Sequence, residues 1–500
     1  MGSRIQGEHS RFRRNSTLAA PSHRLKNASE AVGSSIVGAH NVNIVATGGG
    51  KDSNIHAVGS TIAAGNTVNL AADNAIVLEA SKNSFNQLGS NASSGASIGV
   101  GFAGGSQNGF TIELGVSQGR GKDNANELSY NNTRVSGASG VNIVSGGDLT
   151  LRGAVIDGQR VNADIGGNLN IESLQDTSFG SSRQNSSGLN VSLCIPPICY
   201  GISTVGGNAA GAKADGAYAS VQEQSGIQAG DGGFNVDVAG NTDLKGGVIE
   251  STQGAIDAGK NSFQTAGTLT TSDIQSFSTS SGSSYAVSAS VGFMAGGAAS
   301  QRQAMGDQGM SDSQIATASN TRPSGSAGVG SSSSSQTSTT KAGISGMAGD
   351  QTVRTGSSAS TGALIKDWNT QTIIKDVQAQ AQITAEFGRN ASAAVGAYAN
   401  GKLDEAKALY DQAASESDPD KKAALYAQAG EIEHNWKEGG AYRIAAHAAV
   451  GGLTGGAAGA AGAAASSIAI PAIGERIAEL DMPVPVKQAL VMATGPPSEL

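Results

Sequence analysis

Aromatic and charged residues are scarce in this chain of 500 residues. Aromatics make up 4% and charged residues 14%, whereas charged residues are roughly a quarter of an ordinary globular protein. The formal net charge is −8, and no large basic block offsets it, so the electrostatic footprint of a nucleic-acid-binding protein is missing. Hydrophobic residues still reach 38%, which is enough for a core. A repetitive fold is therefore favoured over an ordinary globular domain.

A secretory signal is also missing from the start of this sequence. The first thirty residues are basic and lack the continuous apolar stretch of a signal peptide. If the protein is exported, we expect the export signal on a longer parent chain, or a natural start that differs from this one.

Cysteine is nearly absent as well. The two cysteines, Cys194 and Cys199, enclose Ile-Pro-Pro-Ile. In an exported protein we expect them to form a small hairpin disulfide. In a reducing cytosol they would remain two thiols that pack like small hydrophobic groups.

No residues converge on a catalytic or cofactor site. Residues 99–104 fit the GxGxxG dinucleotide pattern, but they lie in a Gly-rich β pattern that no helix follows. No two of the six histidines have the close spacing of a helical metal site, and the cysteines have no neighbouring ligand cluster. The sequence therefore predicts no enzyme activity, no cofactor and no metal.

What the sequence does contain is an internal repeat of about 93 residues. The tripeptide SSG ends at Gly95, Gly188 and Gly282, which are 93 and 94 residues apart. The segments GSTI, GAVI and GGVI, which start at 59, 153 and 246, recur with the same two spacings. Two markers with one long period predict a repeat architecture.

A shorter rhythm of 20 residues lies inside this unit, because GDLTL at 147–151 is followed by GNLNI at 167–171. Apolar residues alternate with Asn, Thr or Asp, which is typical of a strand with one buried face. Coils stacked at about 20 residues each would form a continuous Val/Ile/Leu core. The predicted fold is mainly β: an unstructured start (1–35) and a right-handed parallel β-helix (36–295) of three units. A β-sandwich or barrel is the alternative.

A different kind of segment follows each block of coils. Residues 97–102, 189–193 and 285–291 alternate small or polar residues with apolar ones, and residues 110–116 complete the first as a hairpin. We expect these β-hairpins to project from the β-helix. They are either binding surfaces or decoration of a sheet edge.

Two further regions follow the predicted β-helix. Residues 296–363 consist largely of Ser, Gly, Thr and Ala, including five serines at 331–335, and their composition predicts a linker. Residues 364–438 have helical spacing, and Asp418-Pro419 divides them into two arms. A plain helical hairpin is favoured over a tetratricopeptide unit, which requires more repeats.

The last region, residues 439–500, is predicted to be an α-helical Ala/Gly-rich tail. Residues 444–474 carry no charge, and Gly451, Gly455 and Gly459 are four apart. One hypothesis is a pair of short helices that inserts into a membrane when triggered, with His447 as a pH-sensitive charge. The alternative is a flexible or packed Ala/Gly region.

These segments resemble a known family. GNTVNL, GGDLTLRGAVIDG and GGNLNIESLQDTS look like the haemagglutinin repeats of filamentous-haemagglutinin-type exoproteins over residues 38–291. Residues 439–467 resemble the pretoxin region of contact-dependent growth-inhibition proteins. The family's secretion domain, Asn-rich boundary motif and toxin do not occur in this sequence, so a truncated, silent or split gene product is one expectation.

The resemblance implies a structural display and toxin-delivery segment of a secreted exoprotein on the surface of a Gram-negative bacterium. The implied partners are an outer-membrane two-partner secretion transporter and a receptor or envelope of the target cell. A membrane is a further candidate partner through residues 439–474, and nucleic acid is not expected. The alternative function is a haemagglutinin-like adhesin for cell attachment or biofilm formation.

Overall fold

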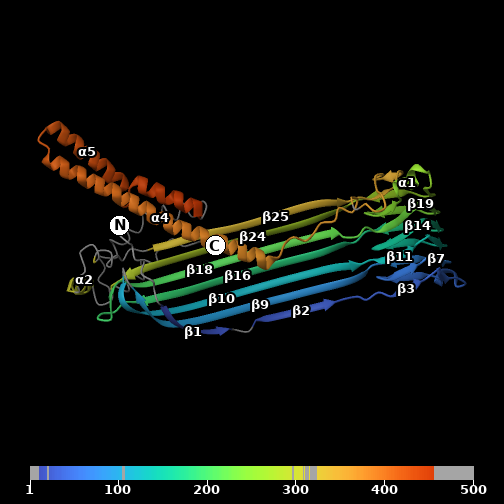
Figure 1. Cartoon of the computed structure of the whole chain (residues 1–500), viewed down its shortest axis with the longest axis horizontal. Coiled ribbons are helices and arrows are strands. Elements are labelled where there is room, and N and C mark those ends of the chain that lie inside the picture. The colour runs from blue at the N-terminus through green and yellow to red at the C-terminus, as the bar shows by residue number, and fades with distance from the viewer. Residues whose placement is uncertain are drawn as a thin grey trace.

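The computed structural model describes residues 11–19 and 22–454, except 104–106, 295–297, 308, 310–314, 316–323 and 358. The chain is mainly β, and its long helices follow residue 369 (Figure 1). The predicted class, mainly β with a helical part after the strands, is therefore confirmed. Two sheets consist almost entirely of short parallel strands, and the third consists of long antiparallel strands.

The short parallel strands form a stack of coils at one end of the molecule (Figure 1). We call residues 35–79, 133–172 and 226–272 the coil stack. Its strands are β3 (Ser35–Gly38), β4 (Val42–Ala46), β5 (Ile55–Val58), β6 (Thr61–Ala64), β7 (Thr67–Ala72), β8 (Ile76–Glu79), β11 (Thr133–Gly137), β12 (Gly140–Ser145), β13 (Leu149–Arg152), β14 (Ala154–Ile165), β15 (Leu169–Glu172), β19 (Gly226–Val238), β20 (Thr242–Lys245), β21 (Val248–Glu250), β22 (Ser262–Thr265) and β23 (Leu269–Ser272). A 3-10 turn, η1 (Gly50–Asp52), and a short helix, α1 (Gln253–Asp257), lie in its connections.

The core of the coil stack follows from the alternation in these strands. In β7, Val68 and Leu70 are buried, and in the parallel neighbour β12, Val141 and Ile143 lie directly beside them. The buried cluster is made of Val, Ile, Leu and Ala, and Phe234 is its one fully buried aromatic residue among those described. The scarcity of aromatics thus matches a narrow core of small branched side chains.

Asparagine side chains form ladders on the outside of the coil stack. Asn69 Nδ2 donates to Asn43 Oδ1 at 2.6 Å, Asn142 to Asn69 at 2.8 Å, and Asn162 to Asn142 at 2.9 Å. The amide is both donor and acceptor, so one residue type at one register position can bond to the coils above and below. This explains why Asn recurs between the apolar residues.

The register explains the long repeat. Thr133 lies beside Ala154, 21 positions on, whereas Arg134 lies beside Thr61, 73 positions back. Short and long coils therefore alternate, and one of each makes up a unit of 93 or 94 residues. The extra length of every long coil is a hairpin.

The hairpins extend away from the coil stack and, which the sequence does not predict, pair with one another into a single antiparallel sheet (Figure 1). This hairpin sheet contains β1 (Arg11–Ala19), β2 (His23–Ser29), β9 (Ser81–Ala103), β10 (Gln107–Asn131), β16 (Gln175–Leu193), β17 (Cys199–Gly201), β18 (Ser203–Val221), β24 (Ile274–Phe293) and β25 (Ser324–Thr340). Its order is β1-β9-β10-β16-β18-β24-β25, with β2 beside β9 and β17 beside β10.

The spacing of the coils accounts for this joining. Neighbouring strands in a sheet lie about 4.8 Å apart, so the two coils of one unit advance the stack by two strand spacings. Each hairpin contributes two strands, which occupy the same width. Successive hairpins consequently arrive at pairing distance, and β10 pairs with β16 just as β18 pairs with β24.

The same sheet recruits two regions for which the sequence predicts no structure. Within the expected unstructured start, β1 and β2 pair with the outer edge of β9. Within the expected linker, residues 324–340 form β25 and pair with β24, residues 298–307 form helix α2 (Ala298–Asp307), and β26 (Gly343–Ile344) extends the coil stack with the short β27 (Ala348–Gly349) beside it. A free strand edge can order a Ser- and Gly-rich segment because the pairing bonds come from the backbone.

The helical region contains α4 (Thr370–Ser415) and α5 (Pro419–Trp436). Asp418 accepts hydrogen bonds from the amides of Asp420 and Lys421 at the start of α5, where Pro419 takes the first turn, so the predicted break at Asp418-Pro419 coincides with a helix cap. The two helices pack as a hairpin, and residues 441–454 form a further helix. The first half of α4 lies on the hairpin sheet (Figure 1).

Candidate functional site

Helix α4 lies against the hairpin sheet where the strands carry glycine. A Cβ atom at Gly330 would lie 2.1 Å from the Val377 carbonyl oxygen, and one at Gly328 would lie 2.0 Å from that of Ala381. A Cβ atom at Gly282 would lie 2.3 Å from the Ile373 side chain. Any larger residue would push the helix off the sheet, so Gly328 and Gly330 mark a close approach of backbone to backbone.

Trp368, just ahead of α4, fills a notch above two more glycines. A Cβ at Gly216 would lie 2.5 Å from the indole, and one at Gly180 would lie 3.1 Å from it. The indole belongs to a small buried cluster whose other members are Ala212, Ala214, Tyr218, Ile373, Ile374 and Val377. Within the described residues its buried Nε1 has no hydrogen-bond partner.

Carboxylates of β10 hold the start of the helix. Lys366 Nζ donates to Glu127, and to Ser178 Oγ at 3.0 Å, and lies 5.0 Å from the centroid of the Trp368 ring. Gln371 Nε2 donates to Asp123. The first hairpin and the helix are thus joined by charge-assisted bonds across the sheet.

Beyond α4, the far end of the hairpin sheet has two unlike faces, because successive side chains of a strand point to opposite sides. In β9, Ser97, Gly99 and Gly101 lie on one face, and Ile98 and Val100 lie on the other. Cross-strand neighbours continue both patterns. We call the two surfaces the polar face and the apolar face.

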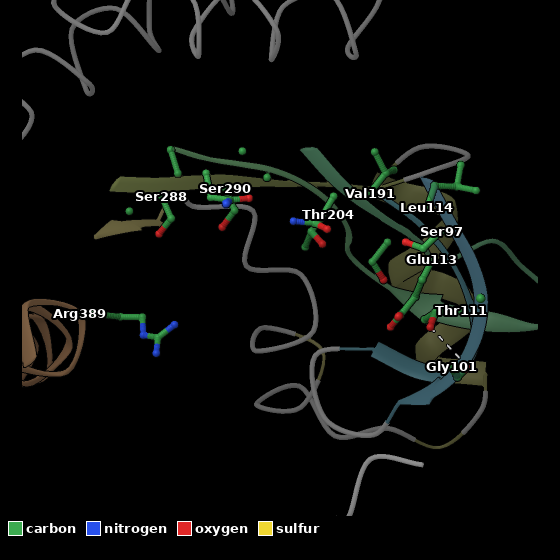
Figure 2. A pocket seen from close by; sticks show the side chains of 18 of the residues that line it. Ser97, Gly101, Thr111, Glu113, Leu114, Val191, Thr204, Ser288, Ser290 and Arg389 are labelled. Carbon is green, nitrogen blue, oxygen red and sulfur yellow. Dashed lines mark hydrogen bonds between the residues drawn. The ribbon is translucent and has the colours of Figure 1, made fainter. Parts of the chain in front are cut away.

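The polar face forms a groove of about 680 Å³ beside α4 (Figure 2). Thr111 and Glu113 of β10, Thr204 of β18 and Ser288 of β24 line it, and Arg389 extends from α4 on the side opposite Glu113. Thr111 Oγ1 donates to the Gly101 carbonyl oxygen at 3.4 Å. A groove of hydroxyls with one cation and one anion can take a polar ligand or chain segment.

The apolar face is hollowed into a trough of about 1050 Å³. Val116, Leu189 and Val287 contribute to its lining, and their exposed fractions are 54%, 56% and 44%. Phe102 and Phe110 form an edge-to-face pair at the hairpin end, with centroids 5.2 Å apart. Contiguous exposed apolar surface of this kind is typical of an interaction surface.

A row of cations crosses the same face nearer the coil stack. Lys122 lies beside Arg183, and Arg183 lies beside Lys213, in three adjacent strands. All three side chains are exposed, and none makes an ion pair within the part of the chain that the structure describes. Like charges directly opposite are unfavourable for a sheet alone, so the row favours an anionic partner.

The structure places the sequence-predicted site residues apart from one another. Cys194 and Cys199 are joined by a disulfide and are fully buried.

Gly451 and His447 lie in the helix at 441–454, and the pKa of His447 is lowered by burial and by the nearby Arg443. Gly455 and Gly459 lie outside the described residues. No helix among the described residues combines the length and the apolar character that crossing a membrane requires.

The GxGxxG match lies mostly in a strand. Gly99 and Gly101 belong to β9 and lie on the polar face, so no helix begins there to hold a phosphate. Gly104 lies outside the described residues. No group of potential metal ligands gathers anywhere in the described part of the chain.

Sequence reasoning missed the residues that dock α4. Lys366 and Trp368 lie in one segment and Glu127 in another far along the chain, and the meeting of the two segments depends on the joining of the hairpins. One signal was available in the sequence: glycine at alternate positions, as at Gly328 and Gly330, indicates that another backbone comes close to a strand face.

Part of the chain matches a known protein family. Residues 19–191 match the family of the haemagglutinin repeat. These residues are therefore similar to the haemagglutinin repeats of filamentous-haemagglutinin-type proteins, and the chain resembles contact-dependent growth-inhibition exoproteins. No solved structure matches the chain.

Several known proteins are similar to about half of this chain. Toxin CdiA of Escherichia coli is 38% identical over 248 residues, which cover 48% of this chain and 8% of that protein. Deoxyribonuclease CdiA of Dickeya dadantii (strain 3937) is 36% identical over 249 residues, or 49% and 7%. A tRNA nuclease CdiA of Yersinia mollaretii is 34% identical over 226 residues, or 45% and 8%. The chain spans less than a tenth of the length of these three relatives.

Proposed function

We propose that this chain is a structural display and toxin-delivery segment of a much longer secreted exoprotein, exposed on the surface of a Gram-negative bacterium. The observation that carries the proposal is the hairpin sheet. It joins all three repeat units and also binds α4 through Trp368, Lys366 and Gln371. A coil stack fastened in this way forms a stiff spacer that ends in a helical arm.

We further propose the hand of the coil stack and the roles of the regions along the chain. The coil stack is a β-helix of right hand, as nearly all crossovers between parallel strands are. Residues 36–295 act as the repeat spacer, and residues 439–500 act as a pretoxin-like segment. The partners are a two-partner secretion transporter and a receptor or envelope of the target cell, and no residue of this segment is catalytic.

Deletion of the first hairpin tests the function. The parent exoprotein without residues 81–131 is produced at the surface of an inhibitor strain, and both attachment to target cells and growth inhibition of those cells are measured. Delivery predicts that attachment persists and that inhibition falls strongly. A matched control, Ser117→Ala on the same hairpin, is expected to change neither.

An adhesin is the second candidate, and the apolar face favours it. The trough beside Val116, Leu189 and Val287 offers exposed apolar surface, and the cation row lies on the same face. This alternative predicts that the same deletion abolishes attachment. Loss of attachment together with unchanged inhibition would contradict the delivery function.

The segment at 439–474, with Gly451, Gly455, Gly459 and His447, is proposed to be a membrane-active element. A peptide of these residues is added to lipid vesicles, and binding and helix content are measured. Binding with a gain of helix is expected. A peptide that neither binds nor becomes helical would remove the membrane from the list of partners while leaving the display function intact.

A further inference from the structure

The two outer edges of the hairpin sheet are protected in different ways. At one edge, β1 contains three arginines in nine residues. At the other edge, β25 has 17 residues with no charged residue and no proline. Charges and prolines are the usual means by which sheet edges avoid pairing with other chains, so the sequence of β25 leaves its own edge without protection.

Helix α4 supplies the missing protection. Gln380 Oε1 accepts a hydrogen bond from the Ser331 amide at 3.1 Å. Thr384 Oγ1 donates to the Gln380 carbonyl oxygen at 2.6 Å and also contacts the Val329 carbonyl oxygen at 3.3 Å. Alternate residues of a strand direct their backbone groups to the same side, so Val329 and Ser331 present the outer edge of β25. The helix therefore occupies bonding positions that another strand would use.

The cover is held by one small apolar cluster together with the strand-glycine contacts and the polar bonds described above. One small apolar cluster around Trp368 anchors α4, and the buried indole Nε1 is unpaired within the described residues. Next to the edge contacts, Ile383 and Phe387 remain 70% and 51% exposed. The Ser331 to Thr337 stretch of β25 is itself exposed. Such a helix can leave without unfolding the sheet beneath it.

The direction of the strands identifies the partner. Every neighbouring pair from β1 to β25 is antiparallel, and six such steps make β1 and β25 run the same way. A second copy added head to tail would offer β1 to β25 in parallel, with its arginines at the seam. A copy related by a two-fold axis would place its β25 beside the first β25. The two strands would be antiparallel, like every other pair in the sheet, and neither carries a charge.

We infer that α4 is a removable cover over a strand-pairing edge, and that uncovered β25 pairs with the β25 of a second copy of this chain. The inference does not depend on the delivery function proposed above. It concerns the assembly of this segment, and a failed delivery experiment would leave it unaffected.

The test uses the full chain and two independent ways of lifting the helix. Gly330→Leu places a side chain where the Val377 carbonyl oxygen lies 2.1 Å from the ideal Cβ. The double variant Gln380→Ala, Thr384→Ala removes the edge contacts and keeps good helix formers. Gly95→Leu is the matched control, because its Cβ would meet only a serine hydroxyl, at 3.1 Å, far from α4.

Light scattering gives the mass, and hydrogen exchange reports on the Ser331 amide. For both variants that lift the helix we expect twice the 49.5 kDa mass of one chain. The native chain and Gly95→Leu are expected to stay monomeric. Adding Ser333→Pro to Gly330→Leu should restore the single chain, because proline removes an outward N–H and is tolerated on an edge strand.

Three outcomes would overturn the inference. A single chain with fast exchange at Ser331 would mean that the bare edge does not pair. A single chain whose Ser331 amide still exchanges slowly in both lifted variants would mean that α4 is not the cover. A doubled mass that survives Ser333→Pro would place the contact elsewhere and would equally refute pairing through β25.

Discussion

The coil stack and the hairpin sheet are both built from strands of alternating polarity. The coil stack buries the apolar face of its strands, whereas the hairpin sheet leaves its apolar face exposed. In the coil stack the apolar side chains point inward, and Leu149 and Leu151 are fully buried. At the far end of the hairpin sheet Ile98 and Val100 are 61% and 54% exposed, while the glycine-bearing face receives α4. Alternation in the sequence therefore shows that a strand has two unlike faces. Which face is buried depends on the elements that pack against it.

The largest expected effect is on the buried side of this comparison. Leu151→Ala should lower the free energy of unfolding by about 4 kcal/mol, because it removes a fully buried side chain and leaves a cavity. Val100→Ala on the apolar face should change it by less than about 0.5 kcal/mol. Urea unfolding measures both. Equal losses would mean that the apolar face is buried in solution.

The second prediction concerns a carboxyl group inside the coil stack. Glu250 is 3% exposed, and burial raises its pKa to about 7 from 4.5. Since the folded state favours the protonated form, stability is fully present below pH 4.5 and is lost as the pH rises through 7. The expected loss is about 3 kcal/mol. Glu250→Gln should remove this dependence from unfolding measured between pH 4 and 8. An unchanged pH profile in that variant would assign the dependence to other groups.

A third, smaller effect belongs to the far end of the hairpin sheet. Reduction of the Cys194–Cys199 disulfide, which joins cysteines five positions apart, should cost about 2 kcal/mol. Thermal unfolding with and without reductant measures it, and a Cys194→Ser, Cys199→Ser double variant should not respond to reductant. Lack of any response in the native chain would argue against the disulfide in solution.

The smallest effect is expected for a conservative substitution where the helix meets the sheet. Trp368→Phe should change stability by no more than about 1 kcal/mol, because lost packing is offset by removal of the buried, unpaired N–H. Trp368→Ala should cost about 3 kcal/mol and increase hydrogen exchange in the first turns of α4. A Phe variant as damaging as the Ala variant would indicate a partner for the indole.

The repeat and the coils could be predicted from the sequence because both are periodic and local. The spacings of 93 and 94 residues between Gly95, Gly188 and Gly282 and the alternation at 147–151 are visible in the sequence alone. The docking of α4 could not be predicted in this way. Lys366 and Glu127 are 239 positions apart, and their contact exists only because the hairpins pair.

The sequence by itself determined the core of the coil stack, since inward Val, Ile and Leu at period two can be buried only by stacking. Only the tertiary structure decided that three hairpins form one sheet and that the uncharged segment at 324–340 is its edge strand. The physical reason is that two coils and two hairpin strands occupy the same width. Edge pairing uses backbone groups, which every sequence shares and no side-chain pattern reveals.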